Sequence, residues 1–150
     1  MSCNKRWWKL AALGLLGVAA PFSLNAAAQD AATLRVTVEG LGPQSPNVYV
    51  SVYAGDDDWL GESPVARAEI VPASGELSAE ISLPLGEYAF SAFLDVNRNG
   101  ELDSNFIGIP KEPVAVSNNA RPRFGPPSYE DARFELGAEG VLQTIQLVEP

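Results

Sequence analysis

The stretch ELSAEISLPLGEYAFSAFL, residues 76–94, decides the fold class of this chain. Apolar side chains recur at every second position over residues 76–83, and again over residues 88–94 after the turn LPLGEY. Successive side chains of a β-strand point to opposite faces, so a period of two predicts two strands that each bury one face. The apolar positions are Leu77, Ala79, Ile81, Leu83, Tyr88, Phe90, Ala92 and Leu94.

The same pattern recurs along the rest of the chain. Gly- and Pro-bearing turns such as GPQSP and GAEG separate the segments, and no amphipathic helix is evident beyond the first 28 residues. The five further strand candidates are residues 33–39, 47–53, 65–71, 132–136 and 141–148. Seven short strands predict an all-β fold, an antiparallel immunoglobulin-like or transthyretin-like β-sandwich. Residues 106–129 fit no strand period, and their aromatic content predicts one long, ordered loop region.

The N-terminus has the three parts of an export signal. Lys5, Arg6 and Lys9 form a cationic start, residues 10–22 are apolar, and residues 26–28 form a small-residue cleavage site. The apolar run is shorter than the roughly 20 residues that span a bilayer, which favours a cleaved peptide. We therefore expect a signal peptide over residues 1–28, a single domain over residues 29–150, and a periplasmic or extracellular location.

Charge excludes one class of partner. Without the predicted signal peptide, seven basic and nineteen acidic side chains remain, a net charge of −12. This balance argues against binding to nucleic acid, whose phosphates require cationic contacts. It also disfavours adsorption to anionic lipid, so we expect no membrane association after signal cleavage. Cys3 is the only cysteine and lies in the signal, so the domain must be held by its core, with a bound ion as a further source of stability.

The segment DVNRNGELD, residues 95–103, predicts a calcium-type loop. Calcium takes oxygen ligands from alternate positions of a short loop with glycine at the sixth position. The oxygen ligands expected here are the side chains of Asp95, Asn97, Asn99 and Asp103 and the backbone carbonyl of Glu101. Phe106 stands where the twelfth position usually carries an acid. With only two carboxylates, we expect a weak site with a dissociation constant on the order of 10⁻⁴ to 10⁻³ M.

A simple turn is the alternative for this segment. Asn99-Gly100 between two extended runs is a strong signal for a two-residue hairpin turn, because both residues tolerate positive φ. A hairpin gives no reason for Asp95, Asn97 and Asp103 all to fall at odd positions of the loop. A calcium loop requires this spacing. Both interpretations are compatible with the sequence.

Residues 83–134 closely resemble a family of exported bacterial proteins known as domain of unknown function 2141 (DUF2141). The resemblance is carried by the D-x-N-x-N-G-x-L-D loop at 95–103, the G-I-P-x-E segment at 108–112 and the run SNNARPRFGPP at 117–127. The early segment LRVTVEGL also looks like the start of that family, so the likeness extends over nearly the whole domain. The family has no established activity, so the resemblance implies a fold and an exported location. The loop is also similar to calcium-binding repeats of bacterial surface proteins with transthyretin-like folds, an analogy at the level of the fold.

Catalysis has few candidate residues. The chain contains no histidine, and the predicted mature domain contains no cysteine and no G-x-S-x-G turn, which excludes the common nucleophile and base pairs. The run Asp56-Asp57-Asp58 before Trp59 could supply carboxylates to a hydrolase acting on an envelope polymer, together with Asp95. A polar loop whose Trp59 covers the end of the sandwich is the simpler interpretation.

Arg121 and Arg123 stand out in an acidic protein. Their planar guanidinium groups suit an anionic ligand or the acidic edge of a partner, and alternatively they pin the long loop by bonding its carbonyls and acids. The corner FGPP, residues 124–127, is a possible contact for another protein. The sequence thus predicts an exported, non-enzymatic β-sandwich whose calcium loop orders a surface for a protein or glycan in the cell envelope. The alternative is the carboxylate-dependent hydrolase.

Overall fold

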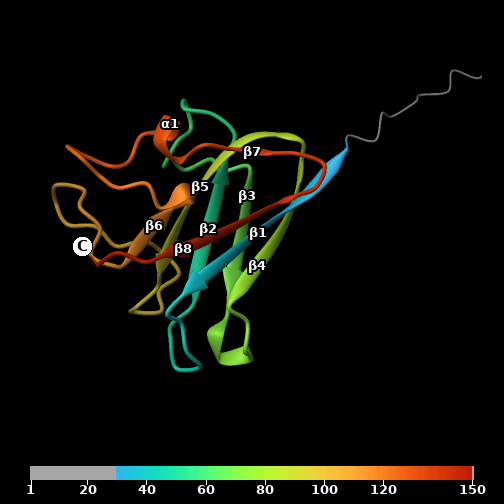
Figure 1. Cartoon of the computed structure of the whole chain (residues 1–150). Coiled ribbons are helices and arrows are strands. Elements are labelled where there is room, and N and C mark those ends of the chain that lie inside the picture. The colour runs from blue at the N-terminus through green and yellow to red at the C-terminus, as the bar shows by residue number, and fades with distance from the viewer. Residues whose placement is uncertain (1–29, 150) are drawn as a thin grey trace, which may run out of the picture.

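Residues 30–149 are described by a computed structural model and form a mostly antiparallel β-sandwich (Figure 1). One sheet has the strand order β4-β1-β8, and the other has the order β3-β2-β5-β6 with β7 also paired to β5. The strands are β1 (Ala31–Glu39), β2 (Val48–Tyr53), β3 (Ala66–Ile70), β4 (Ser78–Pro84), β5 (Gly86–Leu94), β6 (Val114–Val116), β7 (Phe134–Leu136) and β8 (Val141–Gln146). The predicted signal peptide lies outside the described residues.

The core lies between the two sheets and follows the predicted period of two. Along β1 every second side chain, from Ala32 to Val38, is buried, because that face packs on the other sheet. The opposite sheet contributes Val48, Val50 and Val52 from β2 and Phe90 from β5. The antiparallel β-sandwich predicted from the sequence is confirmed in its class.

The turn LPLGEY moves the chain from one sheet to the other. β4 pairs with β1, whereas β5 pairs with β2, so the two strands that the opening stretch predicts do not pair with each other. The Leu85 N–H donates to the Asp30 carbonyl at 3.1 Å, and the Tyr88 hydroxyl donates to the Pro84 carbonyl at 3.0 Å. These bonds fix the crossing, which carries β5 toward the candidate calcium loop.

One pair of strands is parallel. β1 and β8 are paired with Leu34 opposite Val141 and Val38 opposite Ile145, and Figure 1 shows the two strands crossing the front of the larger sheet together. A period of two is common to parallel and antiparallel strands, so it could not reveal this pair. The sequence analysis had expected antiparallel pairs only. Gly140 makes the entry to β8 possible, because its φ is +75° and a Cβ there would lie 2.7 Å from the Thr33 carbonyl oxygen.

The structure also differs from the sequence prediction at two short elements. The predicted strand over residues 132–136 is strand only as β7, and a short helix α1 (Tyr129–Ala132) precedes it. The Ser128 side chain accepts the Asp131 N–H at 3.2 Å, an N-cap that the sequence SYED could have revealed. β6 was missed because three residues are too few to display a period.

The long loop region is ordered, as predicted. It contains β6 and the 3-10 helix η2 (Ser117–Asn119), and a second 3-10 helix, η1 (Pro72–Ser74), lies before β4. Ser117 is fully buried, where its hydroxyl accepts the Phe90 N–H at 3.0 Å and donates to the Ala132 carbonyl at 2.6 Å. This one side chain thus joins β5, η2 and the end of α1. No helix in residues 30–149 has both the length and the apolar character to cross a membrane.

Candidate functional site

The candidate calcium loop begins where β5 ends. The Asp95 N–H donates to the Asn47 carbonyl at 3.0 Å, which anchors the start of the loop to the chain entering β2. The Asp95 side chain is buried, at 3% exposure, and folds back over its own loop. Its Oδ1 accepts the Asn99 N–H at 3.0 Å and its Oδ2 accepts the Gly100 N–H at 2.9 Å. Asp95 therefore closes the loop through both carboxylate oxygens.

The other predicted side chains turn toward the same centre. The Asn97 and Asn99 amides both donate to Oδ2 of Asp103, the second bond at 3.1 Å. The Asn97 Oδ1 accepts the Asn99 N–H at 3.1 Å, so that N–H is shared with Asp95. The side chains of Asn97, Asn99 and Asp103 are therefore bonded to one another, and Asp95 is linked to them through the Asn99 backbone N–H. The side chain of the fifth predicted residue, Glu101, does not take part in these bonds. The ligand expected from Glu101 is its backbone carbonyl.

The loop is not a two-residue hairpin. A type I′ turn at Asn99-Gly100 would need positive φ at both residues, but the positive values belong to Arg98 (φ 61°) and Gly100 (φ 79°). The next strand to pair with β5 is β6, which starts only at Val114. The predicted two-residue turn at Asn99-Gly100 is therefore not present. The backbone of this loop is instead held by hydrogen bonds to side-chain oxygens.

Glu112 is the member of the site that sequence reasoning missed. Its side chain is buried, at 4% exposure, and its two oxygens accept the Val96 N–H at 2.9 Å and the Asp103 N–H at 3.2 Å. Glu112 thus holds the two ends of the loop together. The signal was present in the sequence as the single acid of the G-I-P-x-E segment, nine residues after Asp103, but spacing alone did not place it beneath the loop.

All the ligands predicted for this loop are oxygen atoms. The loop offers two carboxylates, two amides and one carbonyl, and calcium binds such oxygens. Within residues 30–149, no group of three or more Asp, Glu, His or Cys side chains is placed to hold a metal ion. A carboxylate has about four acceptor positions, so the two N–H bonds leave capacity on Asp95.

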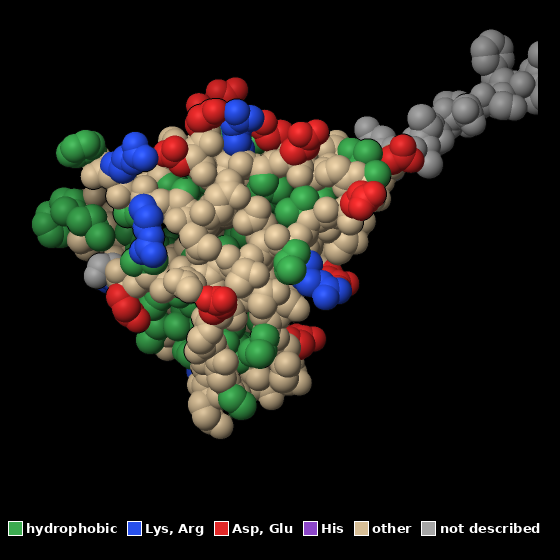
Figure 2. Space-filling view, viewed as in Figure 1, with side chains coloured by type: hydrophobic (Ala, Val, Ile, Leu, Met, Phe, Trp, Pro, Cys, Tyr) green, Lys and Arg blue, Asp and Glu red, His purple; other side chains and the backbone are tan. Residues whose placement is uncertain are grey.

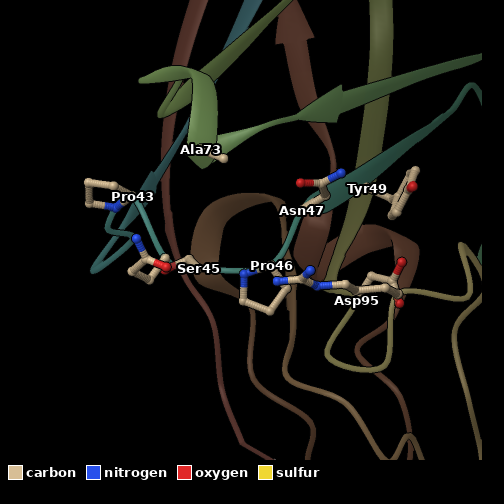
Figure 3. Close-up of a pocket in the computed structure, with 9 residues that line it drawn as sticks. Pro43, Ser45, Pro46, Asn47, Tyr49, Ala73 and Asp95 are labelled. Carbon is tan, nitrogen blue, oxygen red and sulfur yellow. The ribbon is translucent and has the colours of Figure 1, made fainter.

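An open groove of about 460 Å³ adjoins the loop (Figure 3). Tyr49 and Asp95 lie at one end of it and Pro43 and Ser45 at the other, as Figure 3 shows. The pKa of Tyr49 is raised, first because its hydroxyl bonds Glu69 and then because burial and the charges of Glu69 and Asp95 disfavour the phenolate. Its ring stacks on Phe93 with centroids 5.4 Å apart, so β2 and β5 together support this side of the loop.

The aspartate run of residues 56–58 lies away from the loop. It follows the C-terminal end of β2, whereas Asp95 lies beside Asn47 at the other end of the strand. Six strand residues span about 17 Å, more than the roughly 5 to 9.5 Å that separates the paired carboxylates of a glycosidase. The three aspartates are exposed, and Trp59 packs edge-on against Tyr53 and Tyr129. Trp59 therefore packs against a second, smaller apolar cluster that includes Ala89 and Tyr129.

Two asparagines, rather than the two arginines, tie down the long loop. Arg121 and Arg123 are exposed, and neither side chain forms a hydrogen bond or ion pair with another residue in the range 30–149. Asn118 donates to the Arg133 carbonyl at 2.8 Å, and Asn119 donates to the Thr144 carbonyl at 2.9 Å and accepts the Gln146 N–H at 2.9 Å. The loop is thereby attached to β8, and the arginines remain available to solvent.

Comparison with known proteins gives one family. The model of the family described as "Uncharacterized protein conserved in bacteria (DUF2141)" matches residues 36–144, which span β1 to β8. No curated protein and no solved structure matches the chain. The matched range contains the whole loop of residues 95–103, together with Glu112 and the Asn118-Asn119 pair. On this match, the chain belongs to the bacterial DUF2141 family.

Proposed function

We propose that this protein is an exported, non-enzymatic β-sandwich that binds one calcium ion in the loop of residues 95–103. The observation that carries the proposal is the hydrogen bonding within the loop, in which Asp103 Oδ2 contacts both asparagine amides and Asp95 and Asn97 share the Asn99 N–H. The alternate spacing of these side chains, with Gly100 at the sixth position, is that of a calcium loop.

The ion would exchange one set of contacts for another. In the structure, Asp103 Oδ2 accepts hydrogen bonds from the amide nitrogens of Asn97 and Asn99. A cation at that position would repel these N–H groups and attract the amide oxygens, which lie on the same side chains. Together with Asp95 and the Glu101 carbonyl, this gives the five expected ligands. Water or a further protein oxygen would complete the six to eight that calcium takes.

Binding would further stabilise the region that follows the loop. The Asp103 carbonyl accepts the Lys111 N–H at 2.8 Å, and Glu112 bonds the Asp103 N–H, so the segment of residues 104–112 is supported by the end of the loop. We propose that this region is part of a binding surface in the cell envelope, for which a protein or a glycan is the expected partner. The protein then acts as a binding module whose folded form the ion stabilises.

Thermal unfolding tests the calcium site. The exported protein is melted with calcium, with magnesium and with chelator, and we expect calcium alone to raise the melting temperature by several degrees. With a dissociation constant near 10⁻⁴ to 10⁻³ M, about 10 mM calcium corresponds to roughly 1.4 to 2.7 kcal/mol of stability. Magnesium should have little effect, because it requires a smaller, near-octahedral site.

Three variants separate the ion from the loop's own stability. Asp95→Ala and Asp103→Asn should abolish the calcium-dependent rise, whatever their effect in chelator. Glu101→Gln is the matched control, because it removes a neighbouring negative charge while keeping the carbonyl that we assign as ligand, so most of the rise should remain. Equal melting of the wild type in all three buffers would end the proposal.

A further inference from the structure

Two ordered loops of the protein carry large apolar side chains into solvent. Phe106 is 98% exposed and is followed by Ile107 and Ile109, which are 63% and 48% exposed. Phe124, in the corner FGPP, is fully exposed. Large apolar side chains scattered singly are normal on a protein surface, but two protruding phenylalanines on adjacent loops of one region indicate a contact surface.

The first of these tips is held rigidly. The Asn105 Oδ1 accepts the N–H groups of both Ile107 and Ile109 at 3.0 Å, and the Asn105 N–H donates to the Ile109 carbonyl at 2.8 Å. Ser104 and Pro110 form an isolated β-bridge at its base. The backbone is thus fixed in a form that keeps Phe106 outside, and binding through this tip pays little further ordering cost.

The second tip is anchored at both sides. Asn119 bonds β8 before it, and the Trp59 indole N–H donates to the Pro127 carbonyl at 2.8 Å after it. The prolines at positions 122, 126 and 127 restrict the backbone between these anchors. Phe124 is therefore presented by a stiff corner and cannot readily fold back onto the sandwich.

The same region concentrates positive charge. Residues 104–127 contain Lys111, Arg121 and Arg123 and one acid, Glu112, which is buried under the calcium loop. None of the three cationic side chains forms an ion pair within residues 30–149. In a domain with a predicted net charge of −12, this segment is thus cationic at its surface.

Both loops extend to the same side of the molecule, the left in Figure 1, where the gold and orange segments project beyond β6. At that edge Figure 2 shows hydrophobic side chains standing clear of the surface with Lys or Arg side chains beside them. We name this face the tip surface and define it by Phe106, Ile107, Ile109, Phe124 and the cations Lys111, Arg121 and Arg123.

We propose that the tip surface docks the protein on an anionic lipid bilayer. Two convex apolar tips suit a soft medium into which they can insert, whereas a protein partner would need two matching pockets. Aromatic side chains favour the membrane interface, and Lys and Arg beside them attract lipid phosphates. Neither feature alone gives stable anchoring, but apolar insertion and a cationic cluster together do.

The proposal departs from the expectation, based on summed charge, that the protein avoids anionic lipid. Interactions between exposed charges fall off over about 8 Å at physiological salt, so the charges beside the two tips matter more for docking than the summed charge of the domain. It also goes beyond the calcium proposal, since the tips are held by Asn105, Asn119 and Trp59 and need no ion.

Sedimentation with vesicles tests this directly. The exported protein is mixed with phosphatidylcholine vesicles that contain about one third phosphatidylglycerol, and with pure phosphatidylcholine vesicles, each with calcium and with chelator. We expect binding to the anionic vesicles in both buffers, weakened by added salt, and little binding to the neutral ones. Arg121→Gln with Arg123→Gln should weaken binding about 25-fold, at roughly fivefold for each cation.

Exposed positions allow clean controls. Phe106→Ser with Phe124→Ser should leave the melting temperature unchanged and reduce binding at least tenfold. Leu142→Ser, at another exposed apolar residue, and Arg67→Gln, at an exposed arginine on β3, should bind as the wild type does.

Binding that needs calcium and does not depend on the two phenylalanines would be ion bridging and would overturn the proposal. Absence of binding to anionic vesicles would also overturn it and leave a protein partner for the tip surface. The calcium site is judged separately by melting, so either proposal can fail alone.

Discussion

The backbone N–H of Asp103 donates to Oε2 of Glu112 at 3.2 Å, so the last predicted ligand of the calcium loop is positioned by an acid nine residues further along the chain. Oε1 of the same carboxylate accepts the Val96 N–H at 2.9 Å, at the other end of the loop. A single buried side chain therefore bonds the backbone at both ends of the loop, at Val96 and at Asp103. The loop depends on Glu112 whether or not an ion is bound.

Replacing Glu112 by Gln should destabilise the protein. The amide keeps one acceptor oxygen but turns an NH₂ group toward an N–H donor, which leaves a buried donor unsatisfied. The expected loss is about 1–3 kcal/mol in the free energy of unfolding, measured by urea denaturation in chelator. Glu101→Gln, the same change at an exposed position of the loop, should stay within about 0.5 kcal/mol of the wild type. Equal losses for the two variants would show that Glu112 does not hold the loop.

Ser117→Ala should destabilise the junction of β5, η2 and α1. The hydroxyl is fully buried between the Phe90 N–H and the Ala132 carbonyl, and alanine removes both bonds without supplying another partner. We expect a loss of about 1–3 kcal/mol in denaturant unfolding. Ser82→Ala, on the exposed face of β4, is the control, with a change within about 0.5 kcal/mol. A neutral Ser117→Ala would mean that water replaces the hydroxyl.

Asn119 combines a backbone requirement with a side-chain one, and two substitutions separate them. Its φ is 49°, and its amide bonds the backbone of Thr144 and Gln146. Asn119→Gly removes the two hydrogen bonds, which should lower the free energy of unfolding by about 1–3 kcal/mol. It should add no backbone cost, because glycine accepts positive φ. Asn119→Ala should lose roughly 1–2 kcal/mol more, the cost of the left-handed conformation. Identical stabilities of the two variants would contradict the backbone part of this account.

Gly140→Ala should be strongly destabilising. A Cβ at this position would lie 2.7 Å from the Thr33 carbonyl oxygen, and φ is +75°. The overpacking should lower the free energy of unfolding by about 1–3 kcal/mol, and the backbone strain should lower it by about 1–2 kcal/mol more. Gly137→Ala is the matched control, since nothing lies within 4 Å of its Cβ position and its φ requires no glycine. Thermal melting of both variants checks the difference, and a well-tolerated Gly140→Ala would mean that the parallel pairing of β1 and β8 is looser than the structure indicates.

Much of the fold could be predicted because its strands bury one face. The alternation in β1, β2 and β4 follows from contact with the core, so the sequence of these strands records their burial. In β5 Ala89 is buried as well, because the other face of the strand packs on a second apolar cluster. Strand order and direction leave no such record, which is why the parallel pairing of β8 was not predicted. β6 is ordered by its neighbours rather than by its own pattern.

The candidate site was predictable only in part. The loop of residues 95–103 is local, so the spacing of its oxygen-bearing residues could be read directly. Glu112 and the groove beside Tyr49 depend on contacts between separate segments, which spacing does not report. The family match of residues 36–144 identifies the chain without assigning an activity, so the chemistry of the loop rests on its own geometry.

The central claim is that one calcium ion binds among Asp95, Asn97, Asn99 and Asp103, and backbone amide NMR during a calcium titration tests it most directly. The amide signals of Asn99, Gly100 and Glu101, whose N–H groups bond the proposed ligands, should shift together along one saturating curve with a midpoint near 10⁻⁴ to 10⁻³ M. The same titration of Asp103→Asn should weaken or abolish the shifts. If these three signals stay in place up to about 10 mM calcium, tenfold above the weakest expected dissociation constant, the loop is a hydrogen-bonded turn and no calcium site.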